Sequence, residues 1–556
     1  MATPDPTPVS AGLPTRHSWI ANREVEGRAG LRAAVNPATG AAFARTSLLD
    51  AEQAASAVAA ARSAFPGWRA LSFRERARVL LATREVVLRR SDEIASLIEQ
   101  EQGKPAVEAQ LVEVFPALEA LKHLARHAEE LLAEQPLEPQ VLLFAHKDSR
   151  LRYEPYGVVL AVTPWNYPFG ISLSAVATAL AAGNTVVLKP APATTLVGLR
   201  IAEIFREAGV PDGVVNVVAV DDALAPALVE DPGVDKIVFT GSPGTGRRVM
   251  ISAAKNLTPV VLELGGKDPA VVCRDADLDR AARGIVWGAF VNAGQTCASV
   301  ERVYVEADVA EAFLERVVEL TRTLRVGDPA AGDVELGALT LERQRKIVED
   351  HVADAVARGA RVLTGGKPIA GPGFFYPPTV LAGVDHTMRV MREETFGPVL
   401  PVMSVPSIDE AIRLANDSEY GLTASGWTRD SATAQRLERE LQAGVVTIND
   451  CVYTFGEPTA PWGWFKKSGL GRAHGLAGLR EMAQAKYVSR DESSRPMLWW
   501  FPYGDDLRRL LPSAARALHA RSLWGRLGHS ALLMRFSRFR RRGRLASILK
   551  RADRLF

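Results

Sequence analysis

Residues 156–188 read YGVVLAVTPWNYPFGISLSAVATALAAGNTVVL, and this stretch decides the fold class. It carries no charged residue, so its length alone would allow it to span a membrane. However, Gly157, Gly170 and Gly183 divide it into pieces of strand and helix length, and two prolines fall inside it. The stretch therefore predicts a buried strand, a helix and a second strand.

The same alternation continues on both sides of this stretch. Apolar strands are predicted at 157–162, 185–188, 214–218, 236–239, 269–273, 303–305 and 361–363. A helix is predicted at 196–208, and residues 50–132 have a helical pattern throughout. This rhythm is typical of βαβ units around a parallel sheet. We expect an α/β protein of at least two domains, which 556 residues allow.

The composition is that of an ordinary globular protein. Hydrophobic residues make up 47% and charged residues 24%, which excludes a disordered, collagen-like or multi-span membrane chain. Three cysteines cannot build a disulfide framework and suit a reducing compartment. Residues 1–15 predict a disordered lead-in without a secretory signal, so a cytoplasmic location is expected.

Charge is distributed unevenly along the chain. Residues 497–556 carry 14 Lys and Arg against 3 Asp and Glu, and the rest carries 53 against 61. No nucleic-acid partner is expected, because the main body offers no cationic surface. Leu507 to Leu518 at helical spacing, Trp499 to Phe501 and Arg538 to Arg544 predict cationic amphipathic helices on the anionic inner face of a membrane. The alternatives are docking on the protein's own oligomer, a disordered tail or nucleic-acid contact.

Two segments follow predicted strands, where α/β sheets present ligand sites. The first runs from Thr163 to Asn166, and a simple turn is the alternative interpretation of Asn166. The second is the glycine-rich turn from Phe239 to Gly246, whose free amides could hold a phosphate. It lacks the Lys-Ser/Thr pair of a P-loop, which disfavours nucleotide hydrolysis, and a plain tight turn is the alternative.

Two further segments offer reactive side chains. Glu263 lies between apolar neighbours, so its pKa should rise toward neutrality and suit a general base; the alternative is a strand-end carboxylate in solvent. Cys297 stands among small polar residues in what looks like an exposed turn beside a helix, a setting that favours a thiolate nucleophile. Cys273 is expected to be inert core, and no spacing suggests a metal site.

Together these segments resemble the aldehyde dehydrogenase superfamily. Its hallmarks appear in family order as PWN at 164–166, KP at 189–190, FTGS at 239–242, ELGGK at 263–267, GQTC at 294–297, EETFGP at 393–398 and KSGLGR at 467–472. The resemblance implies an aldehyde dehydrogenase-like α/β fold with a Rossmann-like cofactor domain, a catalytic α/β domain and a small β extension that bridges a homodimer or homotetramer. The corresponding residues are 16–139 with 153–265, then 266–445, then 140–152 with 446–490, followed by the basic tail at 497–556.

The resemblance also implies a mechanism. Cys297 attacks the aldehyde carbonyl, Asn166 stabilises the oxyanion, hydride passes to NAD or NADP, and a water activated by Glu263 hydrolyses the thioester to an acid. No metal is implied. The residues implied to bind the cofactor are Thr163, Pro164, Trp165, Lys189, Gly241, Ser242, Gly246, Leu264, Glu394 and Phe396.

Two departures from the family pattern affect specificity. Pro192 stands where NAD-preferring members often carry Glu, so NADP should be tolerated. The usual Pro-Phe-Gly-Gly reads Pro-Trp-Gly-Trp at 461–464, and these tryptophans either pack or narrow a substrate entrance. We expect an apolar aliphatic or aromatic aldehyde, because the surroundings of Cys297 offer apolar and aromatic side chains such as Tyr167 and Phe455. A semialdehyde and a coenzyme A-acylating reaction are the alternatives, and Glu263 argues against the second.

Overall fold

The computed structural model describes residues 12–139, 144, 146–491, 497 and 499–519. They form two compact units. The larger takes the described residues of Met1–Ala133 and Tyr153–Gln484, and the smaller takes those of Glu134–Arg152 and Ala485–Phe556. All candidate site residues therefore belong to the larger unit.

An eight-stranded sheet organises the first half of the larger unit, in the order β22-β12-β11-β8-β9-β10-β2-β3. The inner strands β12 to β10 are parallel; β22 and β2 run antiparallel to them, and the edge strand β3 runs antiparallel to β2. The strands are β2 (Ser18–Ile20), β3 (Arg23–Val25), β8 (Val158–Val162), β9 (Thr185–Lys189), β10 (Val215–Val217), β11 (Lys236–Thr240), β12 (Val260–Glu263) and β22 (Gly469–Leu470). The predicted strands of this region are confirmed.

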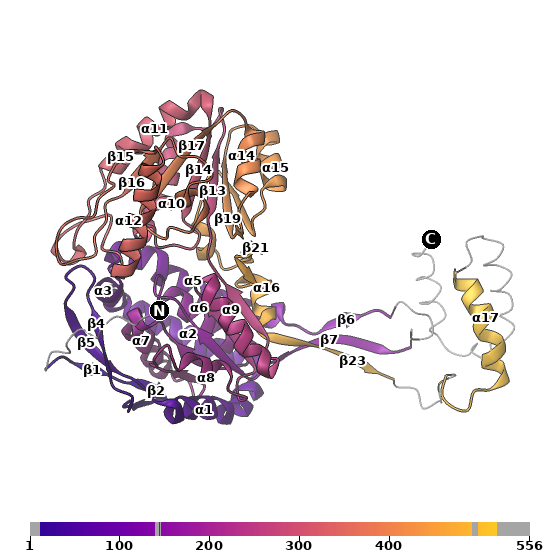
Figure 1. The fold of residues 1–556 in the computed structure, drawn as a ribbon. Helices are drawn as coiled ribbons and strands as arrows, with labels where there is room; N and C mark the ends of the chain where they lie inside the picture. Colours follow the sequence, from indigo (N-terminus) through magenta and orange to yellow (C-terminus); the bar gives the residue numbers. More distant parts are fainter. Residues whose placement is uncertain (1–11, 140–143, 145, 492–496, 498, 520–556) are drawn as a thin grey trace. The chain divides into compact units, whose positions relative to one another are not determined.

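Helices cover both faces of this sheet (Figure 1). Side chains of β8 alternate, so that Val159 and Ala161 pack into one apolar cluster with α5 and α6, whereas Val158 and Leu160 pack into another with α1. The strand, helix and strand predicted within 156–188 are confirmed as β8, α6 and β9. The helices are α1 (Ala51–Ala70), α2 (Phe73–Arg89), α3 (Ser91–Gln102), α4 (Ala106–Ala109), η1 (Gln110–Val114), α5 (Phe115–Leu131), α6 (Gly170–Ala182), η3 (Pro192–Thr194), α7 (Thr195–Glu207), α8 (Ala225–Val229), α9 (Pro243–Ala253) and η4 (Ala254–Asn256).

A seven-stranded sheet, β15-β16-β17-β14-β13-β19-β20, organises the second half. It is parallel except for β15, which runs antiparallel to β16 because no helix crosses over between these two strands. The predicted parallel sheet is confirmed apart from this edge strand. The strands are β13 (Asp268–Val272), β14 (Val300–Glu306), β15 (Arg361–Thr364), β16 (Thr379–Ala382), β17 (Val399–Val405), β19 (Thr423–Trp427) and β20 (Val445–Ile448). The helices are α10 (Leu278–Phe290), η5 (Val291–Gly294), α11 (Ala307–Arg322), η6 (Pro329–Ala331), α12 (Glu342–Ala357), α13 (Arg389–Arg392), α14 (Ile408–Asn416) and α15 (Ser431–Glu440).

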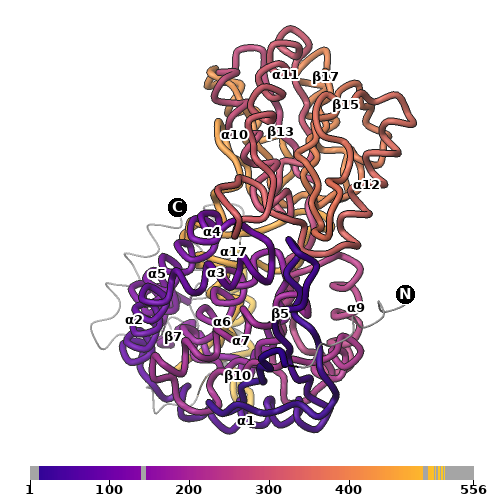
Figure 2. The backbone as a smooth tube through the Cα atoms, turned by 90° about the vertical axis from the view of Figure 1, so that its left-hand side faces the viewer, coloured from indigo at the N-terminus to yellow at the C-terminus, as the bar shows by residue number. Residues whose placement is uncertain are grey.

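The two sheets occupy separate lobes of the larger unit, as the backbone tube shows (Figure 2). Smaller elements complete this unit: β1 (Thr15–Arg16), β4 (Leu31–Val35), β5 (Ala42–Ser47), β18 (Tyr420–Gly421), β21 (Phe465–Lys466), η7 (Tyr453–Gly456) and α16 (Gly475–Glu481). Strand β1 pairs Thr15 with Arg45, so ordered structure begins within the predicted lead-in, whose residues 1–11 lie outside the described part.

The smaller unit contains most of a three-stranded sheet in the order β23-β7-β6, followed by a helix. These elements are β6 (Gln135–Leu137), β7 (Asp148–Pro155), β23 (Ala483–Arg490) and α17 (Asp505–His519). The helix predicted over 507–518 is confirmed as α17, whereas the aromatic and arginine-rich stretch at 536–544 lies outside the described residues. Within the described part, no helix is long and apolar enough to cross a membrane.

Candidate active site

Four parallel strands end at one edge of the eight-stranded sheet, and several of the predicted site residues stand at these ends. Thr163 follows β8 and donates its backbone N–H to the carbonyl of Lys189, the last residue of β9, at 3.1 Å. Gly241 follows β11 and donates to the carbonyl of Glu263, the last residue of β12, at 3.0 Å. Motifs far apart in the sequence thus become neighbours where α/β sheets bind ligands.

Cys297 lies between η5 and β14 in a tightly held turn. Asn292 and Ala293 have φ values of 57° and 52°, a left-handed conformation that costs non-glycine residues free energy. The side chain of Cys297 is half-buried between the buried residues Thr296 and Ala298. The predicted exposed turn is therefore wrong, because the segment is packed inside the larger unit.

Burial is also the main reason why the pKa of the Cys297 thiol is raised well above its usual value. The carboxylates of Glu263, Asp268 and Glu394 raise it further, since negative charge nearby disfavours a thiolate. The expected thiolate-favouring surroundings are not found in this state of the protein. A proton acceptor is needed before this sulfur can act as a nucleophile.

Gly265 and Gly266 allow three site segments to meet. A Cβ on Gly266 would lie 2.3 Å from the carbonyl oxygen of Cys297, and a Cβ on Gly265 would lie 2.5 Å from Oε2 of Glu394. The N–H of Gly266 donates to Oε1 of Glu394 at 2.9 Å. Burial raises the pKa of Glu394 to about 8. The two glycines therefore hold Glu394 and the turn of Cys297 against the end of β12.

Glu263 is buried and is held by two side-chain donors. The indole Nε1–H of Trp462 donates to Oε1 at 2.7 Å, and the hydroxyl of Thr240 donates to Oε2 at 3.2 Å. Burial raises the pKa of Glu263 to about 7, although both hydrogen bonds oppose the rise. The predicted shift toward neutrality is confirmed, and a solvent-exposed strand-end carboxylate is excluded.

Asn166 stands beside the turn of Cys297. Its side-chain Nδ2 donates to the backbone carbonyl of Gln295 at 2.9 Å, which occupies one of the two amide hydrogens. Its own backbone carbonyl accepts from Nδ2 of Asn292 at 2.8 Å and from Nζ of Lys104 at 3.1 Å. The side chain is therefore fixed, and its second hydrogen remains for another acceptor.

A buried ion pair supports this arrangement and was missed by sequence reasoning. Nζ of Lys104 lies 2.5 Å from Oε1 of Glu113, and neither side chain is exposed. Oε2 of Glu113 accepts the backbone N–H groups of Phe169 and Gly170 at 2.8 and 3.0 Å, which anchors the start of α6.

The predicted cofactor residues offer donors that fit a dinucleotide. Ser242 caps α9, whose first turn leaves the N–H of Gly244 for an anion, and Gly246 has no room for a Cβ beside Leu264. Nζ of the buried Lys189 donates to Asp222 at 3.2 Å, and burial lowers its pKa. The rings of Trp165 and Phe396 meet edge to face at 5.4 Å. Pro164 joins Thr163 to Trp165 in the sequence.

The other two cysteines are buried, and burial raises the pKa of both Cys273 and Cys451 to about 12. Cys273 packs in an apolar cluster, which confirms its predicted inert character. Among the described residues, no group of three or more His, Cys, Asp or Glu side chains could hold a metal ion.

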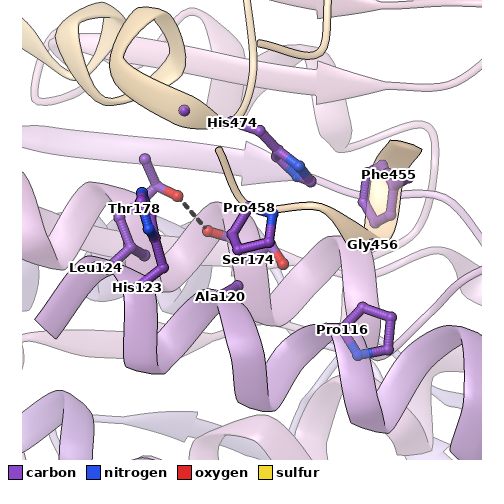
Figure 3. A pocket seen from close by; sticks show the side chains of 11 residues that line it. Pro116, Ala120, His123, Leu124, Ser174, Thr178, Phe455, Gly456, Pro458 and His474 are labelled. Carbon is purple, nitrogen blue, oxygen red and sulfur yellow. Dashed lines mark hydrogen bonds between the residues drawn. The ribbon is translucent and has the colours of Figure 1, made fainter. Parts of the chain in front are cut away.

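A shallow groove with a volume of about 20 Å³, room for about one water molecule, opens between α5, α6 and the segments around Phe455 and His474 (Figure 3). We call it the α5–α6 groove. Its lining consists of Pro116, Ala120, His123, Leu124, Ser174, Thr178, Phe455, Gly456, Pro458, His474 and Gly475. Burial lowers the pKa of His123 and lowers that of His474 to about 4, so both imidazoles are neutral at pH 7. The groove wall is therefore uncharged.

Phe455 connects the α5–α6 groove with the site around Cys297. Its ring packs on His474 at 4.4 Å and edge to face on Trp462 at 5.5 Å. Phe455 and Cys297 pack against the same small cluster, which contains Trp462 and Trp464. Both tryptophans are buried, which fits the packing alternative, whereas Pro461 and Phe465 on either side of them are exposed. The sequence analysis named Phe455 but missed His123 and His474. A signal for the groove was present in the sequence as pairs of small residues four positions apart, Pro116 with Ala120 and Ser174 with Thr178.

The fold and the site place the protein among dinucleotide-dependent α/β oxidoreductases. Residues 25–488 match the model of the aldehyde dehydrogenase family, and the chain belongs to this family. The protein is accordingly an NAD(P)-dependent enzyme that oxidises aldehydes.

Known relatives align over most of their length. A "4,4'-diapolycopene aldehyde oxidase" of a Methylomonas species is 40% identical over 78% of this chain and 81% of its own. A "succinate-semialdehyde dehydrogenase [NADP(+)] 1" of Mycobacterium bovis is 36% identical over 82% of this chain and 99% of its own. The structure of an aldehyde dehydrogenase from Bacillus cereus in complex with NAD+ superposes with a TM-score of 0.83 at 33% identity, covering 86% of this chain and 97% of that chain.

Proposed function

We propose that the protein oxidises apolar aldehydes to carboxylic acids through a covalent intermediate on Cys297. The observation that carries this proposal is the meeting of two features: the Cys297 turn against Gly266, and the buried Glu263 with a pKa of about 7, whose charge acts on the same thiol. They supply a nucleophile and a base at neutral pH. The uncharged α5–α6 groove, which shares Phe455 with the cluster around Cys297, supports an apolar substrate.

In this mechanism, Sγ of Cys297 attacks the aldehyde carbonyl after its proton has been taken up by a nearby acceptor. The free amide hydrogen of Asn166 donates to the oxyanion that forms, an interaction typically worth about 10²–10³ in rate. The bound nicotinamide supplies the acceptor for the hydride that leaves the carbon. Glu263 then takes a proton from the water that hydrolyses the thioester.

For cofactor binding, Ser242, Gly241 and Gly246 would receive the pyrophosphate at the start of α9, and Lys189 would bind the adenosine ribose. Glu394, Phe396 and Trp165 would hold the nicotinamide side, with Thr163, Pro164 and Leu264 as walls. Pro192 begins η3 and brings no carboxylate, so a 2′-phosphate would meet no like charge from that position. We expect kcat/KM for NADP within 10²-fold of that for NAD, and a larger NAD preference would contradict this part of the proposal.

The neutral groove supports an apolar aldehyde over an acidic semialdehyde. None of the described residues that line it is Lys or Arg, and both histidines are neutral at pH 7. A carboxylate buried there would lose its hydration without gaining a partner. The relatives are named for different aldehydes, so their names do not identify the substrate of this protein. The proposed substrate class therefore rests on the residues that line the α5–α6 groove.

An aldehyde panel tests the proposed function. Straight-chain aldehydes of two to ten carbons are compared with succinate semialdehyde, with NAD(P)H absorbance as the readout. We expect kcat/KM to rise with chain length and to be lowest for the semialdehyde. A preference for the semialdehyde would refute the apolar substrate, and failure to find an acyl group on Cys297 by mass spectrometry would refute the mechanism.

We also propose that the enzyme is a homodimer or homotetramer whose β6–β7–β23 sheet contacts a second copy. Isolated three-stranded sheets need a covered apolar face, and Leu137 and Tyr487 are exposed on this one. Mass photometry tests the oligomer; a monomer at micromolar concentration would contradict it.

The exposed Trp500, Phe501 and Tyr503 support contact of the 497–556 segment with an anionic membrane. Co-sedimentation with phosphatidylserine vesicles should fall when Trp500 and Phe501 are both changed to Ser. Equal sedimentation of both forms would contradict membrane contact.

A further inference from the structure

We propose that Trp462 is a positioning residue, whose indole N–H holds the carboxylate of Glu263 in place for thioester hydrolysis. This inference rests on the proposed role of Glu263 as the base. Trp462 is not expected to touch the substrate carbonyl or the cofactor, and it acts through the carboxylate. The contact from Nε1 to Oε1, at 2.7 Å, is the shorter of the two side-chain hydrogen bonds that Glu263 accepts.

The donor is itself fixed before the reaction begins. Trp462 is 1% exposed, and its ring is held edge to face by Phe455. Its backbone carbonyl accepts the N–H of Ala473 at 2.9 Å, which ties the residue to the chain on the other side. A group held by packing and by its backbone costs little entropy when it orients another side chain. The phenylalanine usual at this position of the family pattern has no N–H to donate.

The surroundings of Glu263 make this hydrogen bond important. The strands beside it contribute uncharged groups, namely the hydroxyl of Thr240 on β11 and the backbone of Gly469 on β22. The titratable side chain that interacts electrostatically with Glu263 is Cys297. The carboxylates of Asp268 and Glu394 also raise the pKa of this thiol. No described ion pair neutralises Glu263, so neutral donors carry the stabilisation of its charged form.

The step that depends on this arrangement is hydrolysis of the acyl-enzyme. The oxygen of a water molecule forms a bond to the thioester carbon, while Glu263 accepts one proton of that water. The C–S bond then breaks, the electron pair returns to Sγ of Cys297, and the carboxylic acid leaves. Loss of the indole N–H would raise the pKa of Glu263 and loosen its orientation, which affects this step and spares acylation.

The test follows decay of the acyl-enzyme against pH by rapid quench and mass spectrometry, in the full-length protein with bound cofactor. In the unaltered enzyme the decay rate should fall as the pH drops below the pKa of Glu263. For Trp462→Phe we expect this fall, the acidic limb of the rate profile, to occur at a pH about one to two units higher. Decay at pH 7 should slow by about 10-fold or more and recover at alkaline pH, while the initial burst of NAD(P)H is retained. Trp464→Phe is the matched control, because this neighbouring tryptophan is equally buried and its Nε1 has no hydrogen-bond partner.

Two results would overturn the inference: an acidic limb that stays in place for Trp462→Phe, or the same displacement of the limb for Trp464→Phe. If Trp462→Phe does not fold, replacement by 3-benzothienylalanine keeps the shape of the ring and removes only the N–H, and the same outcomes apply. An unaltered protein that forms no acyl-enzyme would instead refute the proposed function itself.

Discussion

Filling the α5–α6 groove should abolish the preference for long aldehydes. Ser174 lies in the lining on α6, one turn from Thr178 and opposite the α5 residues Ala120 and His123 (Figure 3). Ser174→Trp would overfill the groove, whose volume is about 20 Å³, with an indole at the place where the substrate chain is proposed to lie. The Cys297 turn, the glycine pair and Glu263 belong to other segments and keep their contacts.

The magnitude follows from the apolar area that the groove removes from water. Each buried methylene contributes about 0.8 kcal/mol, which is about fourfold in kcat/KM. Full burial of four methylenes would make an eight-carbon aldehyde exceed a four-carbon aldehyde by about 200-fold, which is the upper limit for the unaltered enzyme. In Ser174→Trp, each methylene beyond the point where the aldehyde chain meets the indole should add almost nothing to kcat/KM.

The assay measures kcat/KM by NAD(P)H absorbance for each aldehyde with both proteins. The ratio between long and short aldehydes is the informative quantity, because it cancels changes in the amount of active enzyme. A thermal melt controls for misfolding. An undiminished ratio in Ser174→Trp would show that the substrate chain lies elsewhere.

Three further substitutions test the site. Cys297→Ala should abolish aldehyde oxidation while cofactor binding, measured by fluorescence quenching, persists; residual turnover at the unaltered rate would disprove the nucleophile. Lys104→Met should lower the free energy of unfolding by about 3–5 kcal/mol in urea, because it leaves a buried carboxylate unpaired, and adding Glu113→Leu should restore most of it; no loss would show that the pair is dispensable. Gly266→Ala should reduce kcat by about 10² or more, since its Cβ meets backbone 2.3 Å away, whereas Gly246→Ala meets only a leucine side chain and should cost less; equal effects would contradict this reasoning.

Much of the fold followed from periodicity because each buried parallel strand is a short apolar run between breakers. The segments at 157–162 and 185–188 are confirmed to within a residue or two as β8 and β9. The direction of β15 could not be predicted from its own residues, because it depends on what connects it to β16. Strand direction is a property of the connection and not of the strand.

The candidate site was less evenly predictable. The raised pKa of Glu263 followed from its apolar neighbours, which are local in sequence. The raised pKa of Cys297 did not, because burial, its main cause, and the nearby carboxylates of Glu263 and Glu394 both arise only in the folded chain. Likewise, the indole of Trp462 was expected to pack or to line an entrance, and its hydrogen bond required the register between two distant segments.

The protonated resting state of the Cys297 thiol has a consequence for damage in the cell. Peroxide and adventitious electrophiles react with thiolates far faster than with thiols. Burial and the nearby carboxylates raise the pKa of the Cys297 thiol, so they slow these reactions between catalytic cycles. Oxidation of Cys297 by peroxide should therefore be slow in the absence of substrate.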